Sequence, residues 1–193
     1  MKKSKINRSI KFSLTIAVIT FVLAAVFSII SSSILGNATW YVGLALVFII
    51  VLIGVVFDML GIASAAANEA PFHAMAAEKV YGAREAVVII KNADKFSSFC
   101  NDVIGDISGI ISGTATAIVV LHISSLLNHA EGSTTQITLS VLLTSFVAAF
   151  TVGGKALGKY FGINGSTAII MYAGKTIAFI ETRLKIKVLP QKK

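Results

Sequence analysis

The chain has 193 residues, of which 55% are hydrophobic and only 13% are charged, and its mean hydropathy is +0.84. A water-soluble domain of this size has too few charged side chains to cover its surface, so the composition argues against a soluble globular protein and indicates a membrane protein. The net charge of +8 comes from lysines at helix ends without interleaved aromatic residues, a pattern that favours topology signals beside anionic lipid over nucleic-acid binding.

Four apolar stretches are each near the length of about 20 residues that a helix needs to cross about 30 Å of hydrocarbon. They are 12–35, 39–62, 103–127 and 136–153. All 17 Lys and Arg residues fall in segments that these spans place on one side of the membrane. Because Lys-rich and Arg-rich loops stay in the cytoplasm, we predict an all-α, polytopic protein of the cell membrane, a single membrane domain of four transmembrane helices with both termini cytoplasmic.

The second span contains one acidic residue, Asp58, which we place near the cytoplasmic half of the helix. An ionisable group inside a membrane is costly and usually faces a cavity or a partner. Two interpretations stay open for Asp58, a ligand for an ion and an interfacial cap for the connector that follows.

The connector, 63–99, is rich in Ala and in paired charges and is too long for a simple turn. Small and apolar side chains recur in it at three- and four-residue spacing, in the two runs Ala74, Ala77, Tyr81 and Ala83, Val87, Ile90. This spacing predicts a cytoplasmic or interfacial hairpin of two amphipathic helices separated by Gly82, with Ser97 or Ser98 capping the third span. The alternative is a solvated cytoplasmic hairpin.

The third span carries the largest set of polar residues. Asp102 and Asp106 are four residues apart, so both carboxylates project from one helical face. Carboxylate and amide oxygens suit Mg²⁺, which prefers octahedral oxygen coordination and keeps several waters. The predicted metal ligands of the chain are Asp106, Asp102, Asp58, Asn101 and Ser108. In the alternative, Asp102 lies in the headgroup region and Asp106 pairs with a lysine.

Small residues also repeat along the third span. Gly105, Gly109 and Gly113, continued by Ala117, form a repeated GxxxG pattern that lets another helix approach closely. His122 and a second histidine seven residues later lie near the outer end of this span, but no third ligand for a transition metal is nearby.

After the fourth span, Ser166 can cap a C-terminal helix over 166–187. Its apolar stripe is Ile169, Ala173, Ile177, Ile180 and Leu184. Lys175 in the middle disfavours a fifth crossing, so we predict a helix that lies in the membrane interface.

The run GAREAVVIIKNADKFSSF, Gly82–Phe99, resembles the connector in the transmembrane domain of the CNNM/CorB/CorC magnesium transporters. Asn92, Asp94, Lys95 and Phe96 match the Asn-Pro-Asp-Arg/Lys-Phe motif of that family, with Ala93 in place of the proline. The similarity extends more weakly over about 55–187. It implies a homodimer that moves Mg²⁺ out of the cytoplasm. The cytoplasmic nucleotide-binding modules of most members are not among these 193 residues, so we expect no ATP-dependent gating.

Two positions depart from the family pattern. Leu60-Gly61 stands where the family has Ser-Glu, and Lys155 stands where it has an acidic residue after glycine, although Lys159 is retained. An ammonium at this place would repel Mg²⁺, or would occupy its site by pairing with Asp106 or Asp58. Alternatively, Lys155 reaches the cytoplasmic interface and leaves the site to other ligands.

The predicted function is therefore CorB/CorC-like transport of a divalent cation, Mg²⁺, by a homodimer in the lipid bilayer. The alternative is a non-transporting relative, a scaffold or regulator that has lost the ion site. An enzyme is not expected. Val103-Ile104-Gly105-Asp106 lacks the first glycine of the Gly-x-Gly-Asp setting of intramembrane aspartyl proteases, and Cys100 alone cannot form an internal disulfide.

Overall fold

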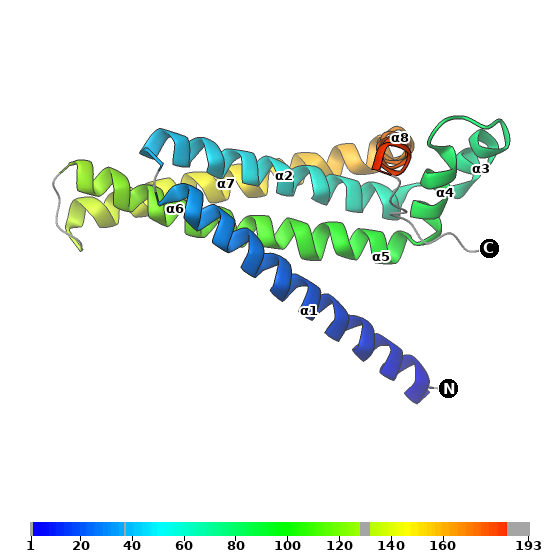
Figure 1. Ribbon diagram of the computed structural model, residues 1–193, viewed down its shortest axis with the longest axis horizontal. Helices are drawn as coiled ribbons and strands as arrows, with labels where there is room; N and C mark the ends of the chain where they lie inside the picture. Colours follow the sequence, from blue (N-terminus) through cyan, green and yellow to red (C-terminus); the bar gives the residue numbers. More distant parts are fainter. Residues whose placement is uncertain (1, 37, 128–131, 185–193) are drawn as a thin grey trace. The chain divides into compact units, whose positions relative to one another are not determined.

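The computed structural model describes residues 2–36, 38–127 and 132–184 and is helical nearly throughout these ranges (Figure 1). In chain order, the elements are α1 Lys2–Leu35, α2 Trp40–Ala66, α3 Glu69–Ala77, α4 Ala83–Lys91, α5 Ala93–Ser98, the π-helix η1 Phe99–Gly105, α6 Asp106–Leu126, α7 Thr134–Asn164 and α8 Ser166–Leu184. These described residues contain no strand, so the all-α prediction is confirmed.

Four of the helices are long and apolar enough to cross a membrane. Their limits are Ile10–Leu35, Trp40–Ala66, Ala93–Leu126 and Thr134–Asn164. This count agrees with the four predicted spans, and it supports a multi-pass membrane protein. The helices extend past the predicted spans into charged residues. The spans were predicted from apolar residues alone, and a helix can keep the same backbone conformation where the side chains become polar.

The third of these helices differs most from its predicted limits. It begins directly after Asn92, and the chain is helical from Ala93 through α5, η1 and α6. No helix start occurs at Ser97 or Ser98, so the predicted cap there is wrong. The Ser97 hydroxyl instead accepts a hydrogen bond from the side chain of Asn101, 3.3 Å away.

The connector contains two short helices, α3 and α4, and Tyr81 of the first predicted run lies beyond the end of α3 at Ala77. The side chain of Asn68 caps α3 by accepting a hydrogen bond from the amide of Ala70 at 3.2 Å. Gly82 precedes α4 with φ +83°, a left-handed conformation that favours glycine. Gly82 is also where α8 comes closest, since a Cβ there would lie 2.5 Å from the amide nitrogen of Lys175.

The chain folds as two compact units, Met1–Val55 with Val103–Gly154, and Val56–Asp102 with Lys155–Lys193. In the first unit, apolar side chains of α2, α6 and α7 form one core, including Val47, Val119 and Val147. A second cluster joins α1 to η1 and α6, and its members include Leu23 and Ile107.

Close helix packing in the first unit uses glycines of α2. A Cβ at Gly54 would lie 2.8 Å from the Cβ of Ser108, and a Cβ at Gly43 would lie 2.7 Å from Val119. A Cβ at Gly109 or Gly113 would meet no described atom within 4 Å. Of the GxxxG pattern in the third span, Gly109 and Gly113 therefore pack against no described helix, whereas the carbonyl oxygen of Gly105 lies 3.7 Å from the Cβ position of Gly54 on α2.

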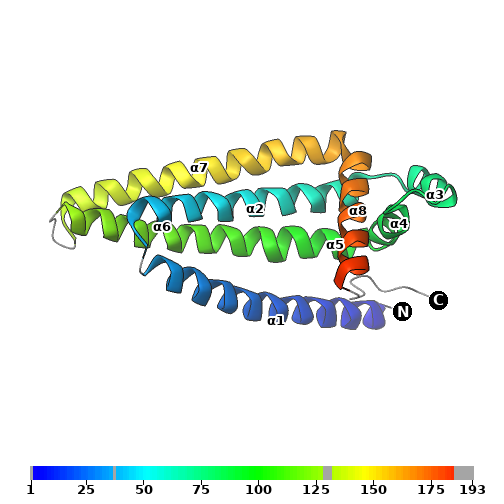
Figure 2. The same ribbon diagram turned by 45° about the horizontal axis from the view of Figure 1, so that its top comes forward.

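In the second unit, α4 packs between α3 and α8. Small residues at the contact between α4 and α8 allow this packing. A Cβ added at Gly174 of α8 would lie only 2.9 Å from the amide nitrogen of Ala86 on α4. The buried side chains around the contact are Ala63, Phe72, Ala83, Ala86, Ile89, Ile90, Ile170 and Met171. Figure 2 shows α8 running crosswise to the end of α7 that it follows. The most buried residues of α8 include Ile170 and Gly174, and Ile169, Ala173 and Ile177 of the predicted stripe are partly buried against the same core.

Candidate cation site

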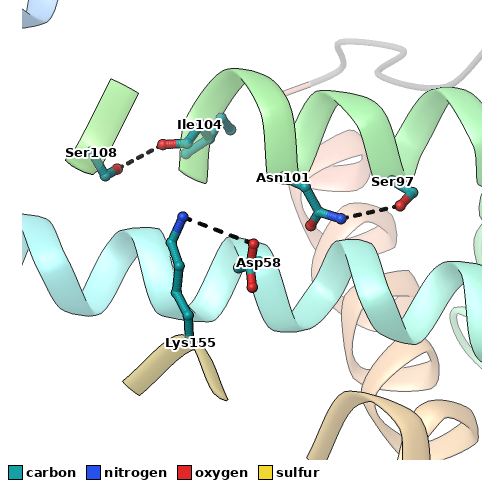
Figure 3. Close-up of polar contacts among 6 residues, drawn as sticks. All are labelled: Asp58, Ser97, Asn101, Ile104, Ser108 and Lys155. Atoms are coloured by element: carbon teal, nitrogen blue, oxygen red, sulfur yellow. Dashed lines mark hydrogen bonds and ion pairs between the residues drawn. The ribbon is translucent and has the colours of Figure 1, made fainter. Parts of the chain in front are cut away.

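The second unit contains a buried ion pair. The Nζ atom of Lys155, on α7, lies 4.0 Å from Oδ1 of Asp58, on α2 (Figure 3). The side chain of Asp58 is 8% exposed and that of Lys155 is 23% exposed. Asp58, one of the two acids considered as partners for Lys155, therefore forms a pair with it. A carboxylate in an apolar helix is costly unless it is paired, and this ammonium provides the pairing charge.

A close approach of α2 and α7 positions this pair. A Cβ at Gly162 would lie 2.9 Å from the carbonyl oxygen of Met59 and 3.3 Å from Ile62. Lys155 precedes Gly162 by two helical turns, so both residues are on the face of α7 that meets α2. The absence of a side chain at Gly162 thus brings the two backbones near enough for Lys155 to reach Asp58.

The amide of Asn101 lies against α2 one turn after Asp58. A Cβ at Gly61 would lie 2.7 Å from Cγ of Asn101 and 3.1 Å from its Nδ2, so the amide occupies the room where another residue would place a side chain. Asp58 and Gly61 are three residues apart, which places them on one face of α2. Asn101 also donates a hydrogen bond from Nδ2 to the hydroxyl of Ser97, which directs the amide group (Figure 3).

Two oxygen atoms of this site lack hydrogen-bond partners. They are Oδ2 of Asp58 and Oδ1 of Asn101, both buried, and the only other buried side-chain atom of this kind among the described residues is the hydroxyl of Ser124 in the first unit. Nearly all buried polar groups in proteins are hydrogen-bonded, so an exception needs an explanation. Carboxylate and amide oxygens are both ligands for a hard cation and acceptors for an ordered water.

The π-helix η1 carries Asn101. A π-helical turn bonds each residue to the fifth along instead of the fourth, and such turns are rare and frequent at functional sites. Here it covers Phe99–Gly105, between α5 and α6 in one continuous helix. The sequence analysis missed this element, because no residue in FCNDVIG distinguishes a π-helical turn from an α-helical one.

The other predicted ligands have different surroundings. The side chains of Asp102, in η1, and Asp106, in the first turn of α6, are exposed. Ser108 is buried, and its hydroxyl donates to the carbonyl oxygen of Ile104 at 2.8 Å. Thus Asp58 and Asn101 are the two predicted ligands that the second unit brings together.

Other metal-binding arrangements find no support in the part of the chain that the structure describes. There, no three His, Cys, Asp or Glu side chains come together. His122 is half-buried, and His129, the other member of the predicted pair, lies outside the described residues.

Two residues of the site were not identified from the sequence, Ser97 as the partner of Asn101 and Gly61 as the space for its amide. The available signal was a glycine one helical turn after the only acid of the second span. This pattern shows that something approaches α2 beside Asp58, but it does not show which helix supplies it.

The four long apolar helices are compatible with a multi-pass membrane protein, and its second unit contains a buried site with a charged pair and an amide. Comparisons of the chain with protein-family models, with curated proteins and with solved structures find no match. The resemblance to the CNNM/CorB/CorC family remains a prediction from the motifs of the connector.

Proposed function

We propose that the protein transports a divalent cation, Mg²⁺, across the cell membrane as a CorB/CorC-like homodimer. The observation that carries this proposal is the pair of buried oxygens without partners, Oδ2 of Asp58 and Oδ1 of Asn101. They are hard ligands of the type that Mg²⁺ prefers, and waters retained by the ion would complete its octahedral shell.

Lys155 acts in this proposal as an internal competitor of the metal. Its ammonium lies 4.0 Å from Asp58, where two unit charges interact by about 4 kcal/mol at an effective dielectric constant of 20. Mg²⁺ and the ammonium therefore cannot share the carboxylate without strong repulsion. Entry of the ion displaces Lys155, and its release restores the ion pair, so the carboxylate of Asp58 has a cationic partner in both states.

The π-helical turn supplies a way to change the ligand set. Conversion of η1 to a regular α-helix shifts the helix by one residue, because an α-helical turn holds one residue fewer than the π-helical turn. This shift rotates Asn101 by about 100° relative to the helix that follows. Such a rotation takes the amide oxygen away from Gly61 and lowers the affinity of the site. This exchange is the step that we assign to opening the site toward the other side of the membrane.

The Asp58–Lys155 pair also favours a second candidate, a non-transporting scaffold or regulator of the same fold. In that protein, the ammonium permanently occupies the cation position. The pair then stabilises the contact of α2 with α7 and has no part in ion exchange.

The experiment that tests the proposal measures Mg²⁺ flux into proteoliposomes and Mg²⁺ binding by calorimetry on the same preparations. We expect flux by the wild type, its loss in Asp58→Asn, a decrease in Asn101→Ala, and tighter binding in Lys155→Met because the competing charge is gone. Lys159→Met is the matched control, since it removes an exposed lysine one turn away on α7. Asp106→Ala tests one of the two other predicted acids.

The outcomes separate the candidates. Flux and binding that persist in Asp58→Asn would exclude this site, and loss in Asp106→Ala alone would move it to the first turn of α6. Absence of flux and binding from the wild type and from Lys155→Met, with both proteins folded, would support the non-transporting relative.

A further inference from the structure

Two aromatic and basic pairs lie on the exposed face of α8. Nζ of Lys175 is 5.6 Å from the ring centroid of Tyr172, and Cζ of Arg183 is 5.7 Å from the ring centroid of Phe179. These distances are within the range of cation–π attraction. The rings are themselves 69% and 55% exposed, so each pair projects from the helix surface.

The four residues form one stripe. They follow one another at intervals of three, four and four positions, which keeps them on one side of a helix, and they extend along about 16 Å of it. We call Tyr172, Lys175, Phe179 and Arg183 the aromatic-basic stripe.

The stripe is exposed, although the backbone and the Cγ atom of Lys175 lie close to Gly82. The buried residues Ile170, Met171, Gly174 and Ala178 lie on the other side of the helix, where α4 packs. Glu181, the one acid of α8, is half-buried and lies about 180° around the helix from the centre of the stripe. The exposed stripe therefore carries positive charge only.

The direction of α8 determines what this surface can meet. Because α8 runs crosswise to residues 155–164, the end of α7 in its own unit (Figure 2), a membrane whose normal follows that end of α7 is nearly parallel to α8. Exposed aromatic rings favour the headgroup level of a bilayer, and basic side chains there are attracted to anionic lipids. Lysine is depleted in protein interfaces, so a protein partner fits this stripe less well than a lipid surface.

We propose that the aromatic-basic stripe of α8 binds the headgroups of anionic phospholipids at the membrane surface. The rings insert at the level of the headgroups, and Lys175 and Arg183 contact the lipid phosphates. The sequence continues with four more lysines in 185–193, which add to the attraction. This lipid site does not depend on cation transport.

The test places a fluorescent reporter in the stripe of the full chain. Trp40 is the only tryptophan, so Trp40→Phe with Phe179→Trp gives one reporter at the stripe. The protein is reconstituted in bilayers of phosphatidylcholine with increasing phosphatidylglycerol, and either lipid carries bromine as a quencher. We expect brominated phosphatidylglycerol to quench at a lower mole fraction, with a preference of about fivefold for each basic side chain at low salt.

Removing the charges supplies the second measurement. In the reporter background, Lys175→Gln with Arg183→Gln should lower the lipid preference toward one. Lys91→Gln with Lys95→Gln is the matched control, because it removes two exposed lysines from α4 and α5 and should leave quenching at position 179 unchanged. Circular dichroism checks that the variants keep their helix content.

Three results would overturn the proposal. Equal quenching by the two lipids would show a membrane contact without charge selectivity. Weak quenching with blue-shifted emission would place the stripe in a protein interface, and weak quenching with red-shifted emission would place it in water.

Discussion

Breaking the Asp58–Lys155 pair from either side should destabilise the protein more than removing both charges. Lys155→Met keeps the length and apolar stem of the side chain but leaves the carboxylate alone in a site where Asp58 is 8% exposed. Asp58→Asn leaves the ammonium without its carboxylate. The double variant removes both charges, so no uncompensated charge remains.

The expected magnitude follows from the burial and the distance. Removing one partner of a buried ion pair costs about 3–5 kcal/mol, because the remaining charge has lost its compensation. Replacing both charges is often close to neutral. With 4.0 Å between Nζ and Oδ1, we expect a coupling free energy of about 2–4 kcal/mol between the two substitutions.

The assay is unfolding of the purified protein by titration with sodium dodecyl sulfate, followed by circular dichroism. The free energies of the wild type, the two single variants and the double variant complete a double-mutant cycle. Lys159→Met, at an exposed position, should change the free energy by less than about 0.5 kcal/mol. Costs of the single variants that simply add in the double variant would refute a stabilising pair between these two side chains.

Three further predictions test other contacts. Gly61→Ala places a Cβ 2.7 Å from Cγ of Asn101, so it should lower the free energy of unfolding by about 1–3 kcal/mol and weaken Mg²⁺ binding measured by calorimetry. An unchanged free energy and affinity would contradict the contact between Asn101 and Gly61. Gly109→Leu should leave the protein folded, since a Cβ there meets no described atom within 4 Å. The same variant should give fewer crosslinked dimers, because the GxxxG pattern would no longer allow close contact with a second copy. An intact dimer would argue against that role of the pattern. In intact cells, an impermeant thiol reagent should label Thr134→Cys and spare Glu78→Cys, and the reverse result would invert the proposed topology.

Apolar length was sufficient to predict the four long helices, because the need to satisfy every backbone hydrogen bond in hydrocarbon leaves few alternatives to a helix. Two short helices in the connector could also be predicted, since Gly82 interrupts two periodic runs, but the spacing did not show that the first helix ends at Ala77, before Tyr81. The limits of the third long helix were not predictable from apolar length, which cannot detect a helix that continues through polar residues such as Asn92 to Ser98.

The site was predicted in part. Asp58 was identified because a lone acid in an apolar helix is costly, and its pairing with Lys155 was one of two alternatives that charge alone allowed. The approach of Asn101 to Gly61 depends on the axial register of two helices, which periodicity does not determine. For the same reason, the sequence could not show that Gly54, rather than Gly109, makes the close approach of α2 and α6.

The contact between Gly61 and Asn101 restricts the order in which substitutions can occur. The family resemblance places an acidic residue at position 61, but the amide of Asn101 already fills the volume that any side chain there would need. An acid at position 61 therefore fits only if the amide of Asn101 moves or residue 101 becomes smaller. A single substitution that restores the acid would change the position of this amide as well as the charge, so its electrostatic effect could not be measured alone.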